Sequence, residues 1–295
     1  MKVQFLNGGL ANQTFQYIFA RHYELSHSGE VMYLDDSYFA LNTVHNGYEL
    51  GKVFGLKPHM LSECFDDEVW NYILEQKNAG KSIPQILCEN GIEMYLISEV
   101  EDTYKKFNPF DGKVIYADCN QYDPVLFGAP GDVYYHGYWI NKNWFLKYKD
   151  IFLKELSFPE ITEKHNWNYA GQIMNTNSLS IHIRRGDYVT LGWSLDAEFY
   201  RGSVNTFIAS CTANWHLFVF SDDIDWCRQN AEAMGFPYFS DVTYIEGNNN
   251  GNNYRDLQLM SMCKAMIMSN SAFCFLAALL NPKKQYLLNM TTRDI

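Results

Sequence analysis

The chain has 295 residues and a formal net charge of −11 at pH 7. This length predicts two compact domains, and the acidic balance argues against non-specific nucleic-acid binding, which needs a basic surface. The first residues show no charged segment followed by an apolar stretch, and no run of about 18 apolar residues occurs. We therefore expect neither a secretory signal nor a membrane span.

Seven cysteines are spread along the chain without forming a CxxC pair. Free thiols in a reducing compartment explain this odd number most simply. The sequence therefore predicts a cytoplasmic protein.

The chain begins with a predicted βαβ unit, in which Lys2–Leu6 and Glu30–Leu34 are strands and Ala11–His27 is a helix. Glycines in the first turn let the backbone approach a ligand, and the helix N-terminus offers free N–H groups. A plain tight turn explains two adjacent glycines at least as well. The candidate ligand contacts in this turn are Gly8, Gly9, Asn12 and Gln13.

The rest of the first half is less regular. Asp66–Lys77 and Asn143–Leu156 are amphipathic and predict helices. Ile83–Cys88 and Glu93–Ile97 fit either short strands or helical turns, and Asp102–Gly112 fits a loop.

Two strands are predicted at Val114–Ala117 and Val133–Trp139. The second ends on the aromatic run His136-Gly137-Tyr138-Trp139, which fits a core cluster, although one or two of these rings could line a groove for an acceptor sugar. A polar stretch with a predicted helix at Glu160–Asn175 follows. We place the domain boundary there and predict domains of residues 1–160 and 161–295.

Strands and helices alternate strictly in the second half, which predicts a parallel sheet with right-handed crossovers. The expected strands are Leu179–Ile183, Trp215–Phe220, Val242–Ile245, Ala265–Ser269 and Gln285–Asn289. The expected helices are Asp196–Cys211, Ile224–Met234, Tyr254–Cys263 and Ala272–Leu280, with a polar loop at Gly247–Asn253. Ser221 or Asp222 is expected to cap the helix that starts at Ile224.

The segment LSIHIRRGDY, residues 179–188, stands out because its strand alternation stops at Arg184-Arg185-Gly186-Asp187. Ligands of open α/β sheets bind outside the carboxyl ends of the strands, where these two arginines would be presented. A guanidinium fork matches phosphate oxygens, so a pyrophosphate is the expected guest. The alternative is that both arginines form ordinary surface ion pairs with Asp187 and other carboxylates.

Loops after parallel strands gather at one edge of the sheet, which should bring three polar segments together. Arg184 and Arg185 would neutralise phosphates, and Ser269, Asn270 and Ser271 would add donors at a helix N-terminus. Ser221, Asp222 and Asp223 would bind a ribose or guanine. Helix capping alone is the alternative for these three residues, and a metal at Asp222-Asp223 is a weaker one.

At this point the sequence resembles the bacterial α-1,2-fucosyltransferases, whose HxRRxD motif is shared with α-1,6- and protein O-fucosyltransferases. The matching segments run nearly end to end: GGLANQTFQY, GYW, IHIRRGDYV, FVFSDDIDWC and DLQLMSMCKAMIMSNSAF. The resemblance implies an α/β fold of two Rossmann-like domains with GT-B architecture. It also implies an inverting transfer of L-fucose from GDP-fucose, with no metal or other cofactor required.

The resemblance further implies roles for individual residues. Arg184 would stabilise the departing GDP, His182 and Asp187 would orient its loop, and the Asp222 region would read the nucleotide. Residues 161–295 would bind GDP-fucose, while residues 1–160 would face the acceptor and place the Gly8–Gln13 turn across the cleft. For the base that takes the acceptor proton, Asp187 is the first candidate and His182 the second, and a purely structural Asp187 is an equal alternative.

The expected product carries fucose on the 2-hydroxyl of a galactoside, in a surface polysaccharide or a lipid-linked unit that would bring the enzyme to the inner face of the membrane. Where the family usually has SNSxFSWWGAWL, this chain reads SNSAFCFLAALL over Ser269–Leu280. Loss of the adjacent tryptophan pair and of the glycine puts helix packing and acceptor preference in question. The rival hypotheses are a fucosyltransferase of different linkage or acceptor, and a non-catalytic protein that binds nucleotide or glycan.

Overall fold

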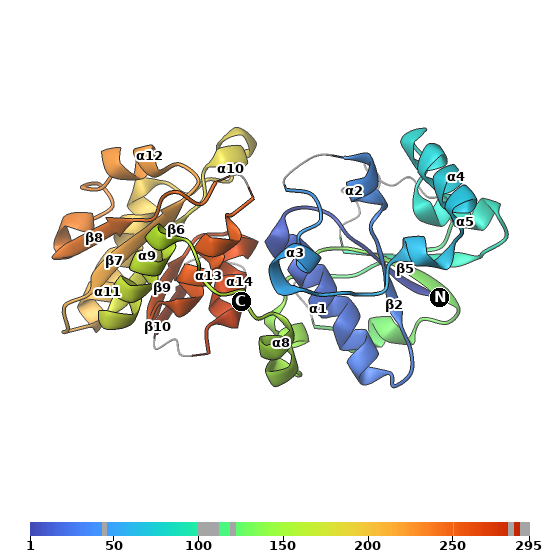
Figure 1. Cartoon of the computed structure of the whole chain (residues 1–295), viewed down its shortest axis with the longest axis horizontal. Coiled ribbons are helices and arrows are strands. Elements are labelled where there is room, and N and C mark those ends of the chain that lie inside the picture. The colour runs from blue at the N-terminus through green and yellow to red at the C-terminus, as the bar shows by residue number, and fades with distance from the viewer. Residues whose placement is uncertain (43–45, 100–111, 119–121, 250, 283–285, 290–295) are drawn as a thin grey trace. The chain divides into compact units, whose positions relative to one another are not determined.

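The structure is a computed structural model that describes residues 1–42, 46–99, 112–118, 122–249, 251–282 and 286–289 (Figure 1). The chain divides into two compact units, Met1–Ser157 and Phe158–Ile295. Each unit has its own parallel sheet with helices packed around it. None of the helices in the described ranges is long and apolar enough to cross a bilayer.

The first unit contains a five-stranded parallel sheet in the order β2-β1-β5-β3-β4. Its strands are β1 (Lys2–Phe5), β2 (Met32–Asp35), β3 (Met94–Ser98), β4 (Val114–Tyr116) and β5 (Asp132–His136). Its α-helices are α1 (Leu10–Ser26), α2 (Ser37–Leu41), α3 (Leu50–Phe54), α4 (Asp67–Asn78), α5 (Ile83–Glu89), α7 (Lys142–Leu146) and α8 (Lys149–Glu155). Short 3₁₀ helices lie at η1 (Leu61–Cys64) and η2 (Pro124–Gly128).

The structure resolves both ambiguous segments of this unit. Residues 83–89 are helical because Ser82 caps the first turn and Pro84 fits its first positions, whereas residues 94–98 form a strand. The predicted loop at Asp102–Gly112 lies outside the described residues, except for Gly112.

The single helix predicted at Asn143–Leu156 is wrong, because α7 and α8 are separate. In a continuous helix the Trp144 carbonyl would accept from the Tyr148 N–H. Here that carbonyl contacts His22 Nδ1 at 2.8 Å, and the Tyr148 N–H donates to Phe145 O instead. A contact with a distant histidine therefore accompanies the break.

The second unit has a five-stranded sheet in the order β10-β9-β6-β7-β8, and the predicted parallel sheet is confirmed. Its strands are β6 (Ser178–Ile183), β7 (His216–Ser221), β8 (Asp241–Tyr244), β9 (Ala265–Met268) and β10 (Tyr286–Asn289). Numbered within the unit, this is the Rossmann order 3-2-1-4-5, whose direction reverses between β6 and β9. A ligand is expected in the crevice at the carboxyl ends of these two strands.

The helices of this unit are α9 (Lys164–Asn175), α10 (Gly186–Leu191), α11 (Ala197–Ser210), α12 (Ile224–Gln229), α13 (Tyr254–Met262), α14 (Ala272–Leu280) and the 3₁₀ helix η3 (Phe236–Tyr238). The helix α10 was not expected from the sequence. The helix α12 ends at Gln229 rather than Met234, and its cap is Asp223 rather than Ser221 or Asp222. Its Oδ1 accepts a hydrogen bond from the Trp226 N–H at 3.0 Å.

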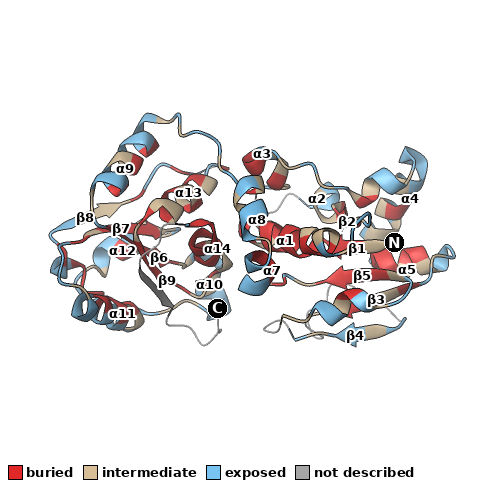
Figure 2. Cartoon of the chain, turned by 90° about the horizontal axis from the view of Figure 1, so that it is seen from below, coloured by how far each residue is buried: buried red, intermediate tan, exposed pale blue. Residues whose placement is uncertain are grey.

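Buried residues follow the sheets and their covering helices, such as α1 in the first unit and α14 in the second (Figure 2). Helix α14 is buried over all residues from Cys274 to Leu280. The prediction of free thiols is confirmed for the six cysteines in the described ranges. Cys119 lies outside those ranges.

Candidate nucleotide-sugar site

The loops after β6 and β9 are joined at the point where the strand order reverses. His182, near the end of β6, contacts Ser269 Oγ through its Nδ1 at 2.8 Å. The ring is buried, and desolvation together with the positive charge of Arg184 lowers the pKa of His182 to about 3. His182 is therefore a neutral bridge between the two loops at ordinary pH.

Arg184 leaves the end of β6 and is held by two carboxylates. Its Nη2 donates to Asp187 Oδ1 at 2.6 Å, and its Nη1 lies 2.9 Å from Asp222 Oδ2. The guanidinium also lies 5.4 Å from the centroid of the Tyr188 ring. The Arg184 side chain is 32% exposed and the Asp187 side chain 52%, so water or a ligand can reach this pair.

Arg185 is held more tightly than its neighbour. Its guanidinium carbon lies 3.9 Å from the Trp226 ring centroid, and its Nε donates to Asp223 Oδ2 at 3.2 Å. Its backbone N–H donates to Asp222 Oδ1 at 2.8 Å. With 16% of its side chain exposed, Arg185 is a fixed charge, whereas Arg184 is the more accessible one.

Three carboxylates thus surround two guanidinium groups, which leaves this ion-paired loop with one net negative charge. The predicted alternative of surface ion pairs describes this ligand-free arrangement. A diphosphate that binds Arg184 must therefore compete with Asp187, the most exposed carboxylate of the three. Such exposed pairs are worth only about 0–1 kcal/mol, so the exchange costs little.

Ser221, Asp222 and Asp223 hold the loop from the side of β7. Ser221 Oγ accepts from the Asp223 N–H at 3.0 Å, and Asp223 also caps α12. Both oxygens of Asp222 accept from the two arginine residues. Asp223 thus caps α12 and also pairs with Arg185, and Asp222 positions both arginines. Across the described ranges, no group of three His, Cys, Asp or Glu residues is arranged to hold a metal ion.

Gly186 permits the close approach of Asp222. Its φ is +20°, and a Cβ at this position would lie 2.6 Å from Asp222 Oδ2. Any side chain here would push away the carboxylate that holds Arg184 and the Arg185 N–H. The glycine of the RRGD segment is therefore a steric requirement of the ion-paired loop.

Ser269, Asn270 and Ser271 form the turn from β9 into α14. Ser271 Oγ accepts from the Phe273 N–H at 3.3 Å and caps the helix. Asn270 Nδ2 donates to the Trp193 backbone carbonyl at 2.9 Å. Its Oδ1 is buried without a hydrogen-bond partner among the described residues. The structure thus brings the predicted residues after β6, β7 and β9 to one edge of the sheet.

The first-turn candidates lie in the other unit and form a compact structure of their own. Gly8 has φ +77°, and a Cβ there would lie 2.6 Å from Asn12 Nδ2. Gly9 is the N-cap residue of α1. Gln13 is buried: its Nε2 donates to the Gly8 and Gly47 carbonyls, and its Oε1 accepts from the Glu49 N–H, each at 2.9 Å. Gln13 therefore supports the turn from inside.

Residues 112–294 of the chain match the family described as Glycosyl transferase family 11. The chain belongs to this family. It is 30% identical to an Escherichia coli alpha-1,2-colitosyltransferase over 97% of this chain and 88% of that protein. It is 31% identical to the Bos taurus galactoside alpha-(1,2)-fucosyltransferase 2 over 39% of this chain and 34% of that protein. The expected family resemblance is confirmed.

The GT-B fold expected for a family 11 glycosyltransferase is also confirmed. The crystal structure of NodZ alpha-1,6-fucosyltransferase soaked with GDP-fucose is similar, with a TM-score of 0.54 and 13% sequence identity. The match covers 95% of this chain and 93% of that chain. At this identity the likeness concerns the fold.

The departure from the tryptophan-rich family segment falls inside the core of this family 11 chain. Phe275 and Leu276 stand at the positions of the adjacent tryptophan pair, and both are buried in α14. Their replacement therefore changes core packing. The turn at residues 269–271 keeps its capping contacts.

Of the aromatic run at the end of β5, two members serve the core. Trp139 is buried, stacks on Phe19 at 4.3 Å and donates from Nε1 to Gln4 Oε1. His136 is buried against Phe5, and burial lowers its pKa to about 4. Tyr138 remains exposed at 36%. The core explanation therefore holds for His136 and Trp139.

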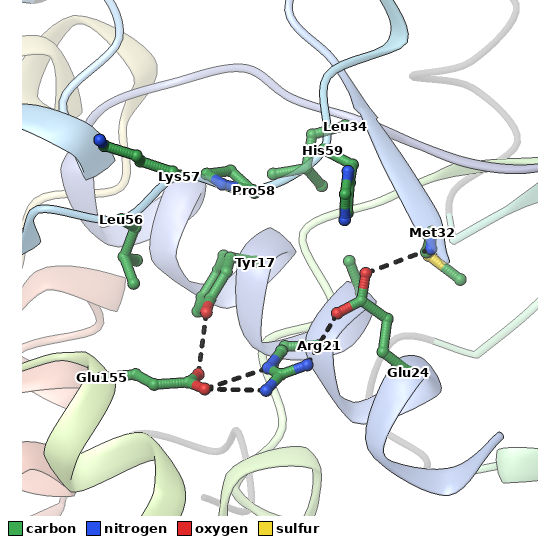
Figure 3. A pocket seen from close by; sticks show the side chains of 11 residues that line it. Tyr17, Arg21, Glu24, Met32, Leu34, Leu56, Lys57, Pro58, His59 and Glu155 are labelled. Carbon is green, nitrogen blue, oxygen red and sulfur yellow. Dashed lines mark hydrogen bonds and ion pairs between the residues drawn. The ribbon is translucent and has the colours of Figure 1, made fainter. Parts of the chain in front are cut away.

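A cavity of about 260 Å³ lies in the first unit between α1, β2 and residues 56–59 (Figure 3). Glu155 reaches it from α8, where it accepts hydrogen bonds from the Tyr17 hydroxyl and from Arg21.

The structural roles of Tyr188, Trp193 and Trp226 in the second unit were not predicted from the sequence. The only available signal was that each aromatic residue lies close in sequence to an arginine or an aspartate of the motifs.

Proposed function

We propose that this family 11 enzyme transfers L-fucose from GDP-fucose to the 2-hydroxyl of a galactoside, with inversion at the anomeric carbon. The observation that carries the proposal is the pair Arg184 and Arg185 after β6, beside the α14 N-terminus, at the switch point of a Rossmann sheet. Two guanidinium groups and a helix N-terminus suit a diphosphate. The α-1,2 linkage is supported by the names of the relatives.

The chemistry follows from where charge develops. As the bond to the anomeric carbon breaks, negative charge grows on the departing phosphate while the sugar becomes oxocarbenium-like. In the proposed mechanism Arg184 exchanges Asp187 for a phosphate oxygen, and Arg185 stays fixed against Trp226 as a second cation. The reaction then needs no metal or other cofactor, since these groups supply the positive charge.

For the proton of the acceptor hydroxyl, we propose Asp187 as the base. Its carboxylate is the most exposed of the loop, and it becomes available when phosphate takes over Arg184. His182 is buried and bridges to Ser269, so we propose that it positions the loop and does not exchange protons with the acceptor. We propose that residues 161–295 bind the donor, and that residues 1–160 face the acceptor with Gly8, Gly9 and Asn12 bordering the donor site and Gln13 supporting their turn from inside.

A second candidate donor is GDP-colitose, because an E. coli relative is named an alpha-1,2-colitosyltransferase. Colitose is fucose without its 3-hydroxyl, so the two donors share the diphosphate chemistry. A site that hydrogen-bonds this hydroxyl rejects a donor lacking it by roughly 10⁴–10⁵, whereas a site built for colitose rejects the extra hydroxyl only by about 10². The size of the preference therefore identifies the donor sugar.

The deciding experiment supplies GDP-fucose or GDP-colitose together with a panel of β-galactosides and determines the product linkage by NMR. We expect fucosyl transfer to the galactose 2-hydroxyl. A product with another linkage would overturn the acceptor part of the proposal, and exclusive use of GDP-colitose would overturn the donor part. A galactoside carried on a lipid, presented in vesicles, tests the proposal that the enzyme acts on a membrane-bound acceptor.

The role of Arg184 is tested by Arg184→Ala. We expect the transfer rate to fall on the order of 10²–10³, as for other preorganised charge-stabilising groups, with the melting temperature retained. Arg228→Ala is the matched control, because Arg228 also pairs with a carboxylate and lies over a tyrosine ring in the same unit. Equal activities of the two variants would contradict the role. A protein that binds GDP but never releases fucose would be the non-catalytic rival.

A further inference from the structure

Helix α10 presents apolar side chains to solvent directly after the ion-paired loop. All six of its residues are at least partly exposed. Val189 and Leu191 are about half exposed, and Trp193, just beyond the helix, is 57% exposed. Burial of such side chains normally stabilises the fold, so their exposure directly after a charged loop requires another explanation.

Trp193 is held in place by the backbone around it. Its N–H donates to the Tyr188 carbonyl at 2.8 Å, closing the end of α10 at Gly192, where φ is +70°. Its own carbonyl accepts from Asn270 Nδ2 at 2.9 Å. These contacts involve only main-chain atoms of Trp193. The indole takes no part in these hydrogen bonds. A substitution of the Trp193 side chain therefore leaves both of them intact.

The indole also extends a row of contacts that starts at Arg184. The Arg184 guanidinium lies 5.4 Å from the Tyr188 ring centroid, and the Tyr188 and Trp193 centroids are 5.6 Å apart in a T-shaped pair. An acceptor hydroxyl must reach the anomeric carbon beside the phosphate that Arg184 is proposed to bind. The Tyr188–Trp193 pair thus lies directly beside the guanidinium that is proposed to bind this phosphate.

We propose that the Tyr188–Trp193 pair is part of the acceptor-binding site and stacks against a sugar ring of the acceptor glycan. The inference rests on the proposed function and adds an acceptor contact from the second unit. A pyranose presents an apolar face of C–H groups, which suits an exposed aromatic ring with a polar edge. Leu191, three positions after Tyr188 and so on the same side of α10, extends the apolar surface for a second ring of the glycan.

The test measures Trp193→Ala, Trp193→Phe and the control Trp167→Ala, which removes a tryptophan of comparable exposure, 67%, from α9. We expect Trp193→Ala to raise the acceptor KM about tenfold, the equivalent of a lost aromatic stack. The donor KM and the slow hydrolysis of donor without acceptor should stay unchanged. Trp193→Phe should recover most of the acceptor affinity, and Trp167→Ala should match the wild type.

Three outcomes would overturn the inference. An unchanged acceptor KM in Trp193→Ala would remove the acceptor contact, and a parallel loss of donor hydrolysis would mean that the pair holds the donor sugar. Loss of binding to anionic vesicles with an unchanged acceptor KM would make the cluster a membrane contact. If the wild type transfers sugar from neither GDP-fucose nor GDP-colitose, the proposed function is overturned, but the further inference can still be tested separately. In that case saturation-transfer NMR can measure how a galactoside binds to the GDP-loaded wild type and to GDP-loaded Trp193→Ala. Weaker binding to the variant would still support the acceptor contact, and equal binding would overturn it.

Discussion

Asp222 is the residue on which the geometry of the arginine pair depends most. One carboxylate oxygen accepts from the Arg185 N–H and the other lies against Arg184 Nη1. It therefore fixes the backbone of one arginine and the side chain of the other. Removal of Asp222 would release Arg184 without removing its charge, so positioning and charge can be separated experimentally.

The substitution Gly186→Ala tests this dependence without changing any charge. The added Cβ would lie 2.6 Å from Asp222 Oδ2, so the carboxylate must move and both of its contacts weaken. We expect GDP affinity to fall by about tenfold, and the free energy of unfolding to fall by about 1–3 kcal/mol from strain. Isothermal titration with GDP and urea unfolding measure the two effects.

Gly192→Ala is the control for strain alone. Gly192 also has positive φ, but a Cβ there meets nothing within 4 Å. Its free energy of unfolding should fall by a similar amount while GDP affinity is retained. Equal GDP affinities for the two variants would contradict the role of Gly186 as the space for Asp222.

Among the elements, the short helix α12 links stability to the site through one side chain. Asp223 Oδ1 caps the helix, and Oδ2 pairs with Arg185 Nε. Asp223→Ala should lower the free energy of unfolding by about 0.5–2 kcal/mol through loss of the cap. Asp223→Asn keeps a capping oxygen and removes the charge, so it should unfold nearly like the wild type. Urea titrations of both variants measure the difference; equal losses would show that the ion pair, and not the cap, stabilises α12.

The elements also show what a sequence can predict. Alternation and apolar runs placed β6, β7 and β9 within one residue at their starts and ends, and α14 at its observed bounds. Helix α10 was missed because it has no buried face to give its sequence a helical period. The break between α7 and α8 was missed because it involves His22, which lies 122 positions away.

In the candidate site, too, one part could be predicted from the sequence and another could not. The convergence of residues 184–187, 221–223 and 269–271 follows from parallel topology, and the sequence predicted it. The pairing of each arginine with its own carboxylate and aromatic ring depends on side-chain geometry, which no spacing rule supplies. That pairing is what makes Arg184 accessible and Arg185 fixed.

At the scale of the whole molecule, each unit holds a buried neutral histidine: His136 at the end of β5 and His182 in β6. Burial lowers the pKa of His136 to about 4, and burial with Arg184 lowers that of His182 to about 3, from an ordinary value of 6.5. Below pH 6.5 the unfolded chain takes up protons that the folded chain does not. Each histidine therefore makes the fold less stable as the pH falls, by about 1.4 kcal/mol per pH unit.

Asp256 acts in the opposite sense, because burial raises its pKa to about 7 from 3.8. Between these values the folded chain holds a proton that the unfolded chain lacks, so Asp256 favours the fold as the pH falls. The free energy of unfolding of the wild type therefore contains pH-dependent contributions of both signs. The difference in the free energy of unfolding between the wild type and a histidine variant, measured against pH, isolates the contribution of that histidine.

We expect His182→Asn, whose amide can replace Nδ1 in the contact with Ser269, to lose less stability than the wild type on acidification from about pH 6.5 to pH 5. The slope of the free energy of unfolding against pH should be smaller by about 1 kcal/mol per pH unit on average over this window. Urea unfolding at several pH values in this window measures it, with His59→Asn, which removes an exposed histidine, as the control. Parallel slopes for His182→Asn and wild type would mean that His182 takes up a proton in the folded protein, and the neutral bridge between the β6 and β9 loops would have to be abandoned.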